Sequence, residues 1–175
     1  MVNQLGNYSL YIALLISIFI IIKTSLSFKN SSVVLSGNIF SLISVQSLMI
    51  IISFLTLIYA FVTSDFSNET VYNNSHTAKP LFYKISGTWG NHEGSLLLWL
   101  LVLTIFLFFF AIDSKNLSQR YRTLTLFFQE IIILGFLLFI LFTSNPFSKI
   151  FPIPTEGTGL NPILQDPALA IHPPI

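Results

Sequence analysis

The side chains of this sequence most able to carry chemistry are its three histidines and one acidic residue. The acidic residue lies within an apolar stretch. A neutral imidazole can ligate a metal ion or a haem iron, and histidines stand at positions 76, 92 and 172. None has a second histidine three or four residues away, so the spacing does not indicate a self-contained metal site. The sequence has no cysteine, which excludes disulfides, cysteine zinc sites, iron–sulfur clusters and thiol nucleophiles.

His172 is followed directly by Pro173 and Pro174. The residue before a proline is pushed toward an extended conformation, so a stiff main chain presents this imidazole. Stiffness lowers the entropy lost when a side chain is fixed on a ligand. His172 is therefore a candidate axial ligand to a haem iron. The alternative is an ordinary exposed histidine near the end of the sequence.

A second candidate site lies in the run Gly-Thr-Trp-Gly-Asn-His-Glu-Gly-Ser, residues 87–95. In one interpretation it is structural: Trp89 suits a membrane interface, the glycines permit a tight turn, and Glu93 suits the first turn of a helix. In the other, Trp89, His92 and Glu93 line a docking surface. The residue types leave both interpretations open.

The remaining candidates favour structural roles. His76 lies in the most polar stretch, residues 63–80, which is expected to sit in water. Glu130 lies inside an apolar stretch, where a carboxylate is costly and raises a functional hypothesis. The favoured alternative is that Glu130 faces other helices and is protonated or hydrogen-bonded. The sequence contains no nucleotide-binding glycine loop, serine nucleophile elbow or zinc-protease His-Glu pair.

The composition indicates the kind of fold that positions these residues. The chain of 175 residues is 53% hydrophobic and 9% charged, with a mean hydropathy of +0.78, far too apolar for a soluble domain. Four stretches are long enough to cross a bilayer: residues 5–22, 39–62, 94–112 and 123–142. The sequence thus predicts an all-α integral membrane protein with four transmembrane helices and an extended Pro-rich C-terminal segment. Its parts are residues 1–62 with the first two helices, an outer-side loop over 63–93, a transmembrane hairpin over 94–142 and the Pro-rich outer segment over 143–175.

The basic residues predict the orientation. Residues 23–38 and 113–122 carry five Lys and Arg in 26 positions, whereas the opposite side carries three in 68. Positive charge stays on the inner side, so both termini are expected outside. The excess of Phe and Ile resembles the codon bias of an AT-rich organellar gene. We therefore expect the mitochondrial inner membrane with termini toward the intermembrane space, or alternatively a bacterial inner membrane with periplasmic termini. The net charge of +1 gives no indication of nucleic-acid binding.

The C-terminal segment has an unusual composition. Seven of the eight prolines fall between Pro146 and Pro174, interleaved with apolar residues. Proline excludes a long helix, and the apolar residues argue against a disordered tail. We expect an extended segment packed along the membrane surface or against a partner.

Two stretches of the sequence resemble one known family. The first ends in Lys84-Ile-Ser-Gly-Thr-Trp-Gly-Asn-His-Glu-Gly-Ser-Leu-Leu-Leu-Trp99, and the second runs from Gly135 through Leu164-Gln-Asp-Pro to Ile171-His-Pro-Pro. They resemble the N-terminal part of the CcmF family, the haem lyase subunit of a cytochrome c maturation system. The likeness covers most of residues 65–174.

The resemblance implies a multi-span inner-membrane protein that receives haem from the haem chaperone CcmE and helps attach it to apocytochrome c on the outer side. His172 matches the first of the family's two outer haem-binding histidines. The second, the Trp-rich domain and the family's two intramembrane haem ligands have no counterpart in this sequence. It therefore resembles a fragment, from a split gene or an incomplete sequence, that is not expected to be catalytic alone. The resemblance implies that haem is held transiently and is shared with the remaining CcmF fragments. Other maturation subunits and membrane lipid would also contact the chain.

A function of another class stays open as the alternative. The chain could be a non-catalytic membrane subunit of a transporter or respiratory complex, whose outer loops only pack on neighbours. In a transporter we expect many polar groups inside the spans. Beyond Ser and Thr, the polar side chains that stand out in these spans are Gln46 and the Gln129-Glu130 pair.

Overall fold

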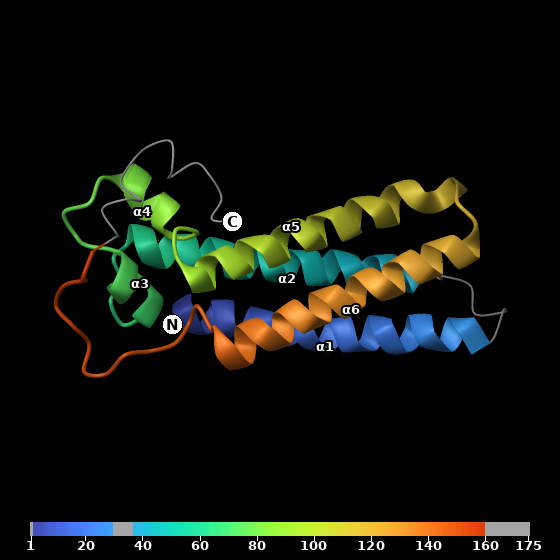
Figure 1. Cartoon of the computed structure of the whole chain (residues 1–175), viewed down its shortest axis with the longest axis horizontal. Coiled ribbons are helices and arrows are strands. Elements are labelled where there is room, and N and C mark those ends of the chain that lie inside the picture. Colours follow the sequence, from blue (N-terminus) through green and yellow to red (C-terminus); the bar gives the residue numbers. More distant parts are fainter. Residues whose placement is uncertain (1, 30–36, 160–175) are drawn as a thin grey trace.

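Four long helices form the body of the molecule. The computed structural model describes residues 2–29 and 37–159, where the long helices are α1 (Val2–Lys29), α2 (Gly37–Val62), α5 (His92–Asp113) and α6 (Gln119–Thr143). All four are long and apolar enough to cross a membrane. They run side by side along the long axis (Figure 1). The predicted all-α fold with four membrane-spanning helices is thus confirmed within the described residues.

Three of the four long helices extend past their predicted spans at both ends, and α2 extends past its span only at its start. The largest difference is in α1, which continues from Ile22 to Lys29. Two interactions let polar residues join this helix. The Thr24 hydroxyl donates to the Ile20 carbonyl at 2.8 Å, and the Lys23 ammonium lies over the Phe19 ring, 5.0 Å from its centroid. Hydropathy identifies only the apolar stretch. The helix itself continues as long as its polar side chains find hydrogen-bond or ring partners on the same helix.

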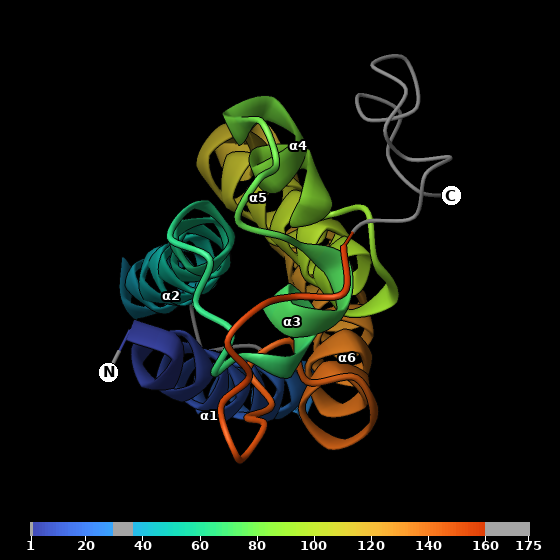
Figure 2. The same cartoon turned by 90° about the vertical axis from the view of Figure 1, so that its left-hand side faces the viewer.

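The four helices pack in a ring. Helix α1 contacts α2 and α6, and α5 contacts the same two helices from the other side, as the view along the bundle shows (Figure 2). Fully buried aliphatic side chains such as Leu10, Ile43 and Leu137 fill the centre. Large aromatic side chains such as Phe106 and Phe142 are exposed on the outside, as expected for a surface that faces lipid.

One end of the bundle carries a polar cap, by which we mean residues 63–91 and 144–159. It includes two short helices, α3 (Glu69–Asn74) and α4 (Leu81–Gly87). The cap lies at the end where α1 begins (Figure 1). Part of the polar stretch expected in water is instead buried, since Asn68 and Ser75 have no exposed surface. At the opposite end a short 3₁₀ helix, η1 (Ser114–Asn116), joins α5 to α6.

Hydrogen bonds tie three distant segments together in the cap. The Asn68 side chain donates to the Pro146 carbonyl at 2.9 Å, and an isolated antiparallel bridge pairs Asn68 with Lys149. The Asp65 carboxylate accepts from the Asn3 side chain at 2.8 Å and from the Ser67 hydroxyl at 2.6 Å. The start of α1, the loop before α3 and the chain after α6 therefore form one structure.

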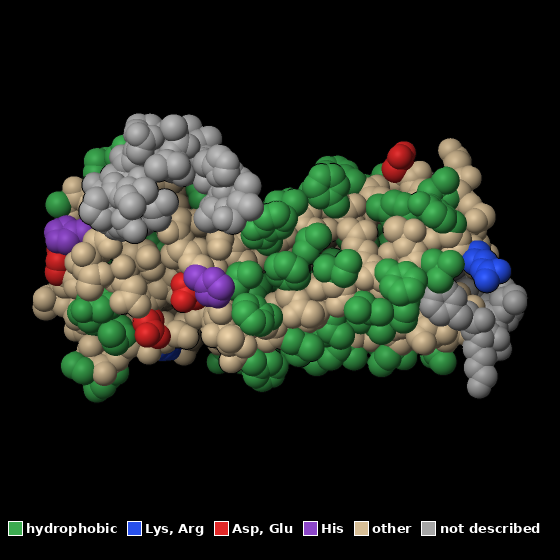
Figure 3. Space-filling view, in the orientation of Figure 1, with side chains coloured by type: hydrophobic (Ala, Val, Ile, Leu, Met, Phe, Trp, Pro, Cys, Tyr) green, Lys and Arg blue, Asp and Glu red, His purple; other side chains and the backbone are tan. Residues whose placement is uncertain are grey.

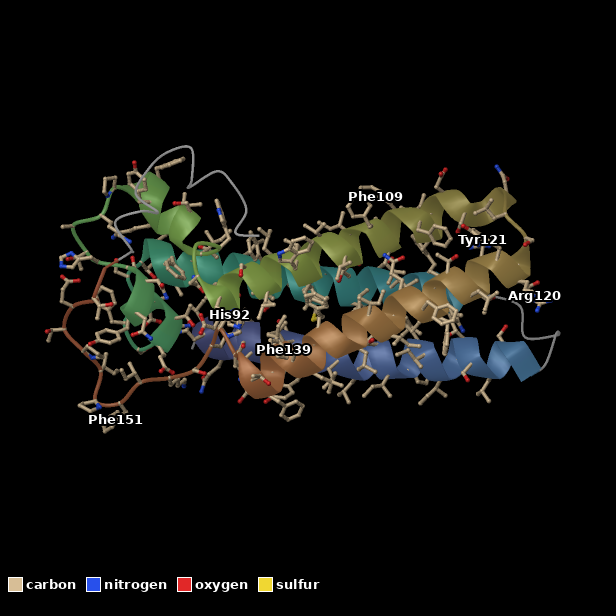
Figure 4. The ribbon with its side chains drawn as sticks, in the orientation of Figure 1. His92, Phe109, Arg120, Tyr121, Phe139 and Phe151 are labelled. Atoms are coloured by element: carbon tan, nitrogen blue, oxygen red, sulfur yellow. The ribbon has the colours of Figure 1, made fainter. Side chains whose placement is uncertain are left out.

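Charged side chains differ between the two ends. Figure 3 shows the described histidines and most of the visible acidic side chains at the cap end, and the most prominent Lys/Arg patch at the other end. Arg120, labelled in Figure 4, lies at that far end. The orientation predicted from the sequence places the cap outside, and it stays a prediction.

Cysteine labelling tests this orientation, because the chain has no cysteine of its own. Ala78 in the cap and Asn116 at the opposite end are both exposed. We expect Ala78→Cys to react with a membrane-impermeant thiol reagent added from the outside. Asn116→Cys should react only after the membrane is permeabilised. Reaction of both positions from the same side would contradict the orientation.

Candidate functional site

The turn between α4 and α5 is built to hold a fixed shape. Asn91 caps α5, because its side-chain oxygen accepts the Gly94 N–H at 2.7 Å. The same side chain donates to the Gly87 carbonyl at 2.7 Å. Gly94 lies so close to Thr88 that a Cβ atom would collide with the Thr88 carbonyl oxygen. The structural interpretation of residues 87–95, a tight glycine turn that starts a helix, therefore describes this turn.

His92 connects the start of α5 to the end of α6. Its Nε2 atom lies 3.1 Å from the Ser144 hydroxyl, and its ring meets the Phe139 ring edge to face, with 6.4 Å between centroids. Figure 4 shows the two labelled side chains near each other, where the cap joins the bundle. The His92 residue is still exposed, so a partner could reach it.

Glu93 faces an open polar pocket next to His92. The pocket has a volume of about 230 Å³ and lies where α3, the start of α5 and the end of α6 meet. Its lining is made of hydroxyls, amides and two carboxylates, from Glu69, Thr70, Asn73, Glu93, Thr143, Ser144, Asn145 and Ser148. Such a lining can accept hydrogen bonds from a partner's donors.

The three residues predicted to form a docking surface are thus only partly together. His92 and Glu93 stand at the rim of the cap beside α6. Trp89 is half-buried and packs against the hydrophobic core, so much of its ring faces inward. His172, the predicted haem ligand, lies outside the described residues, so its position stays a prediction. Within residues 2–29 and 37–159, no group of three or more His, Asp or Glu side chains could hold a metal ion.

A second contact in the cap joins His76 to the segment after α6. The Glu156 carboxylate accepts the Thr77 N–H at 3.0 Å and also bonds the Thr77 hydroxyl. His76 Nδ1 lies 3.9 Å from the same carboxylate. The Thr158 N–H then donates to the Tyr72 carbonyl at 2.9 Å. Residues 156–158 are therefore docked on the end of α3, a contact that the sequence analysis did not predict.

Two lysines of the cap are also held in place. The Lys79 ammonium donates to the Asn74 carbonyl at 3.0 Å, and Lys84 donates to the Ser64 hydroxyl at 2.7 Å. Partial burial, and next the nearby Lys84 charge, lower the pKa of Lys79 to about 8. Lys79 therefore carries a smaller share of its charge near neutral pH than an ordinary lysine.

Inside the bundle, Glu130 is completely buried. Its Oε2 atom accepts from the Ser17 hydroxyl at 2.8 Å and from the Gln46 amide at 3.2 Å. Ser17 belongs to α1 and Gln46 to α2, so the carboxyl group of α6 contacts two neighbouring helices. This is the favoured alternative of the sequence analysis, in which Glu130 faces other helices.

The rigid turn predicts a difference between two glycines. Gly94→Ala should destabilise the chain by about 1 to 3 kcal/mol, because the new methyl group overlaps the Thr88 carbonyl. Gly135→Ala is the matched control on α6, where a Cβ meets nothing within 4 Å. It should be neutral or stabilise by up to about 1 kcal/mol. Reversible unfolding in mixed micelles measures both, and equal stability of the two variants would contradict a tightly packed turn.

The Thr77 contact predicts the pH response of Glu156. Hydrogen bonds from Thr77, with a further one from Gly157, lower the pKa of Glu156 from its ordinary 4.5 to about 2. A lowered pKa means that the contact stabilises the fold above the ordinary pKa, and that this contribution is lost as the pH falls through about 2. Carboxyl ¹³C NMR should show a raised midpoint in Thr77→Val and an unchanged one in Thr155→Val. Identical midpoints in wild type and Thr77→Val would rule the contact out.

Known proteins resemble this chain over its whole length. The family model described as "Cytochrome C assembly protein" matches residues 89–175. Cytochrome c-type biogenesis protein CycK of Rhizobium meliloti is 45% identical over 175 residues, which is all of this chain and 26% of CycK. Protein ccl1 of Rhodobacter capsulatus is 53% identical over 126 residues, 72% of this chain and 19% of ccl1. CcmF of Haemophilus influenzae is 40% identical over 176 residues, all of this chain and 27% of CcmF.

The fold agrees with these matches. A solved structure of a cytochrome c haem lyase CcmF aligns with a TM-score of 0.74, covering 85% of this chain and 25% of that protein. Its sequence is 24% identical, so this likeness shows the fold alone. The chain spans about a quarter of the length of CycK and of the Haemophilus CcmF. From the sequence identities together with the shared fold, we conclude that the chain belongs to the CcmF family of cytochrome c-type biogenesis proteins.

Proposed function

We propose that this chain works in cytochrome c maturation as part of a haem lyase assembly, where it helps to hold haem for covalent attachment to apocytochrome c. The observation that carries this proposal is the identity of 40–45% to cytochrome c-type biogenesis proteins across the full chain. The relatives named above are all cytochrome c-type biogenesis proteins by name. They therefore favour this function over the alternative of a transporter or respiratory subunit.

The polar cap is the part of the chain that would face the haem and its carriers. Residues 144–159 leave α6, cross the loop before α3 and dock on the end of α3. The segment that leads toward His172 is thus anchored to the cap about a dozen residues earlier in the sequence. In this proposal His172 supplies one axial nitrogen to the iron of the substrate haem, as a neutral imidazole. A histidine from another chain, or from sequence outside this one, supplies the second.

The rim formed by His92 and Glu93 would contribute to docking. His92 is exposed and fixed by Ser144, and Glu93 lines the polar pocket beside it. A fixed, polar rim suits a protein partner that carries hydrogen-bond donors. The partners in this proposal are the haem chaperone CcmE, the remaining CcmF parts, other maturation subunits and apocytochrome c. Trp89 supports the rim from the core side instead of facing the partner fully.

The proposed location is an inner membrane with the cap on its outer side. The relatives named above are bacterial, which supports the bacterial inner membrane with a periplasmic cap. The expected mitochondrial location rests only on composition and has no support from these relatives.

A histidine substitution tests the haem-holding role. With the other maturation proteins co-expressed, His172→Ala should lower the haem that copurifies with the tagged chain. It should also reduce the yield of mature cytochrome c. His76→Ala is the control, because His76 Nδ1 is engaged within the cap by the Ala78 N–H at 3.1 Å. Unchanged haem and cytochrome c in His172→Ala would exclude the proposed ligand.

A ligand exchange distinguishes direct iron contact from an indirect effect. In His172→Cys a thiolate would replace the imidazole, and thiolate ligation shifts the absorption spectrum of haem. His92→Cys should leave the spectrum unchanged, because His92 is proposed to contact protein and not iron. The same spectrum for wild type and His172→Cys would assign His172 to another role.

A further inference from the structure

The carboxyl group of Glu130 is the most deeply placed ionisable group in the described part of the chain. It lies about 16 Å along α6 from Gln119 at 1.5 Å per residue, and its side chain has no exposed surface. A carboxylate at this depth in a membrane bundle needs either a positive partner or a proton. The surroundings of Glu130 decide between these two.

Among the described residues, no positive charge contacts this carboxyl group. Helix α2 has no acidic or basic residue at all. The Lys23 ammonium of α1 lies over the Phe19 ring instead. The other acidic and basic residues of the four long helices lie within the first or last turns, at Lys29, Glu93, Asp113, Arg120 and Arg122. The contacts of Glu130 with its neighbours are a hydroxyl and an amide, both uncharged.

Two buried oxygens of these hydrogen-bonded groups lack a partner. They are Oε1 of Glu130 and Oε1 of Gln46, and neither accepts a hydrogen bond from any described residue. The other atoms of the same two groups already pair, since Gln46 Nε2 donates to Glu130 Oε2 at 3.2 Å. A carboxylic acid and a primary amide can form two reciprocal hydrogen bonds, one N–H to O and one O–H to O. One proton on Glu130 Oε1 supplies the missing donor and satisfies both orphaned oxygens.

We propose that Glu130 is a proton-binding site, in which the neutral carboxylic acid donates to Gln46 Oε1 and accepts from Gln46 Nε2 and Ser17. The site then joins α1, α2 and α6 by hydrogen bonds in the interior of the membrane without any buried charge. Buried polar groups are stabilising only when every member has a partner. The proton is the ligand that completes this set.

Infrared spectroscopy tests the proposal directly, because a protonated carboxyl group has a C=O stretching band that a carboxylate lacks. The sample is the full chain in lipid nanodiscs at neutral pH, with the glutamates ¹³C-labelled so that their bands can be identified. We expect one protonated glutamate band in wild type and its loss in Glu130→Gln. An ionised Glu130, whether bare or beside a captured cation such as Na⁺, gives no such band and would overturn the proposal.

Two further variants test the pairing with Gln46. Gln46→Leu removes the amide, so the carboxylic acid loses a donor and an acceptor, and its band should move to higher frequency. Ser53→Ala is the matched control on α2, because Ser53 is fully buried and its hydroxyl has no partner among the described residues. It should leave the band in place. A band that Gln46→Leu does not move would refute the acid–amide pair. If a variant fails to fold, the spectrum of the labelled wild type still decides whether a protonated glutamate is present.

Discussion

A bilayer offers no hydrogen bonds to the peptide backbone, and this constraint governs the architecture of the chain. Within hydrocarbon each segment must satisfy its own N–H and C=O groups, which leaves helices as the form that a short single stretch can take. The polar side chains inside the spans obey the same constraint, since Thr24, Ser47 and Thr104 donate to carbonyls of their own helices. Irregular backbone is therefore confined to the ends. That confinement explains why the candidate site lies in the polar cap.

In the cap, side chains form hydrogen bonds with backbone N–H and C=O groups that no helix pairs. Asn68 provides both a donor for the Pro146 carbonyl and an acceptor for the Val71 N–H, and Asp65 joins the start of α1 to the loop before α3. These bonds connect segments that leave different helices. The ends of α1, α2 and α6 are thereby fixed relative to one another, and His92 and Ser144 are brought to hydrogen-bonding distance. The rim geometry is thus a consequence of the bundle and of this network together.

The sequence predicted features that depend on neighbouring residues, but not contacts between residues far apart along the chain. The four spans follow from local composition, and the tight turn before α5 follows from its glycines and Glu93, whereas the Asn91 cap was not predicted. Docking of residues 156–158 on α3 escaped prediction, because its partners are about 80 residues apart and several bonds use backbone atoms that have no sequence signature. Ser75 was expected in water for a related reason. Its burial comes from Gly157, whose missing side chain lets the backbone approach the Ser75 carbonyl.

The cost of a charged group differs between the cap and the interior of the bundle. Charged groups in the cap lie where water and counter-ions screen them, so Glu93 and Glu69 can face an open pocket at little electrostatic cost. Glu130 has no exposed surface, and its side-chain partners among the described residues are the uncharged Ser17 and Gln46. An ionised group there would pull water or a counter-charge into the bundle and separate α2 from α6. The Glu130–Gln46 hydrogen bond links α6 to α2, and the chain passes from the ends of these two helices directly into the two segments of the polar cap.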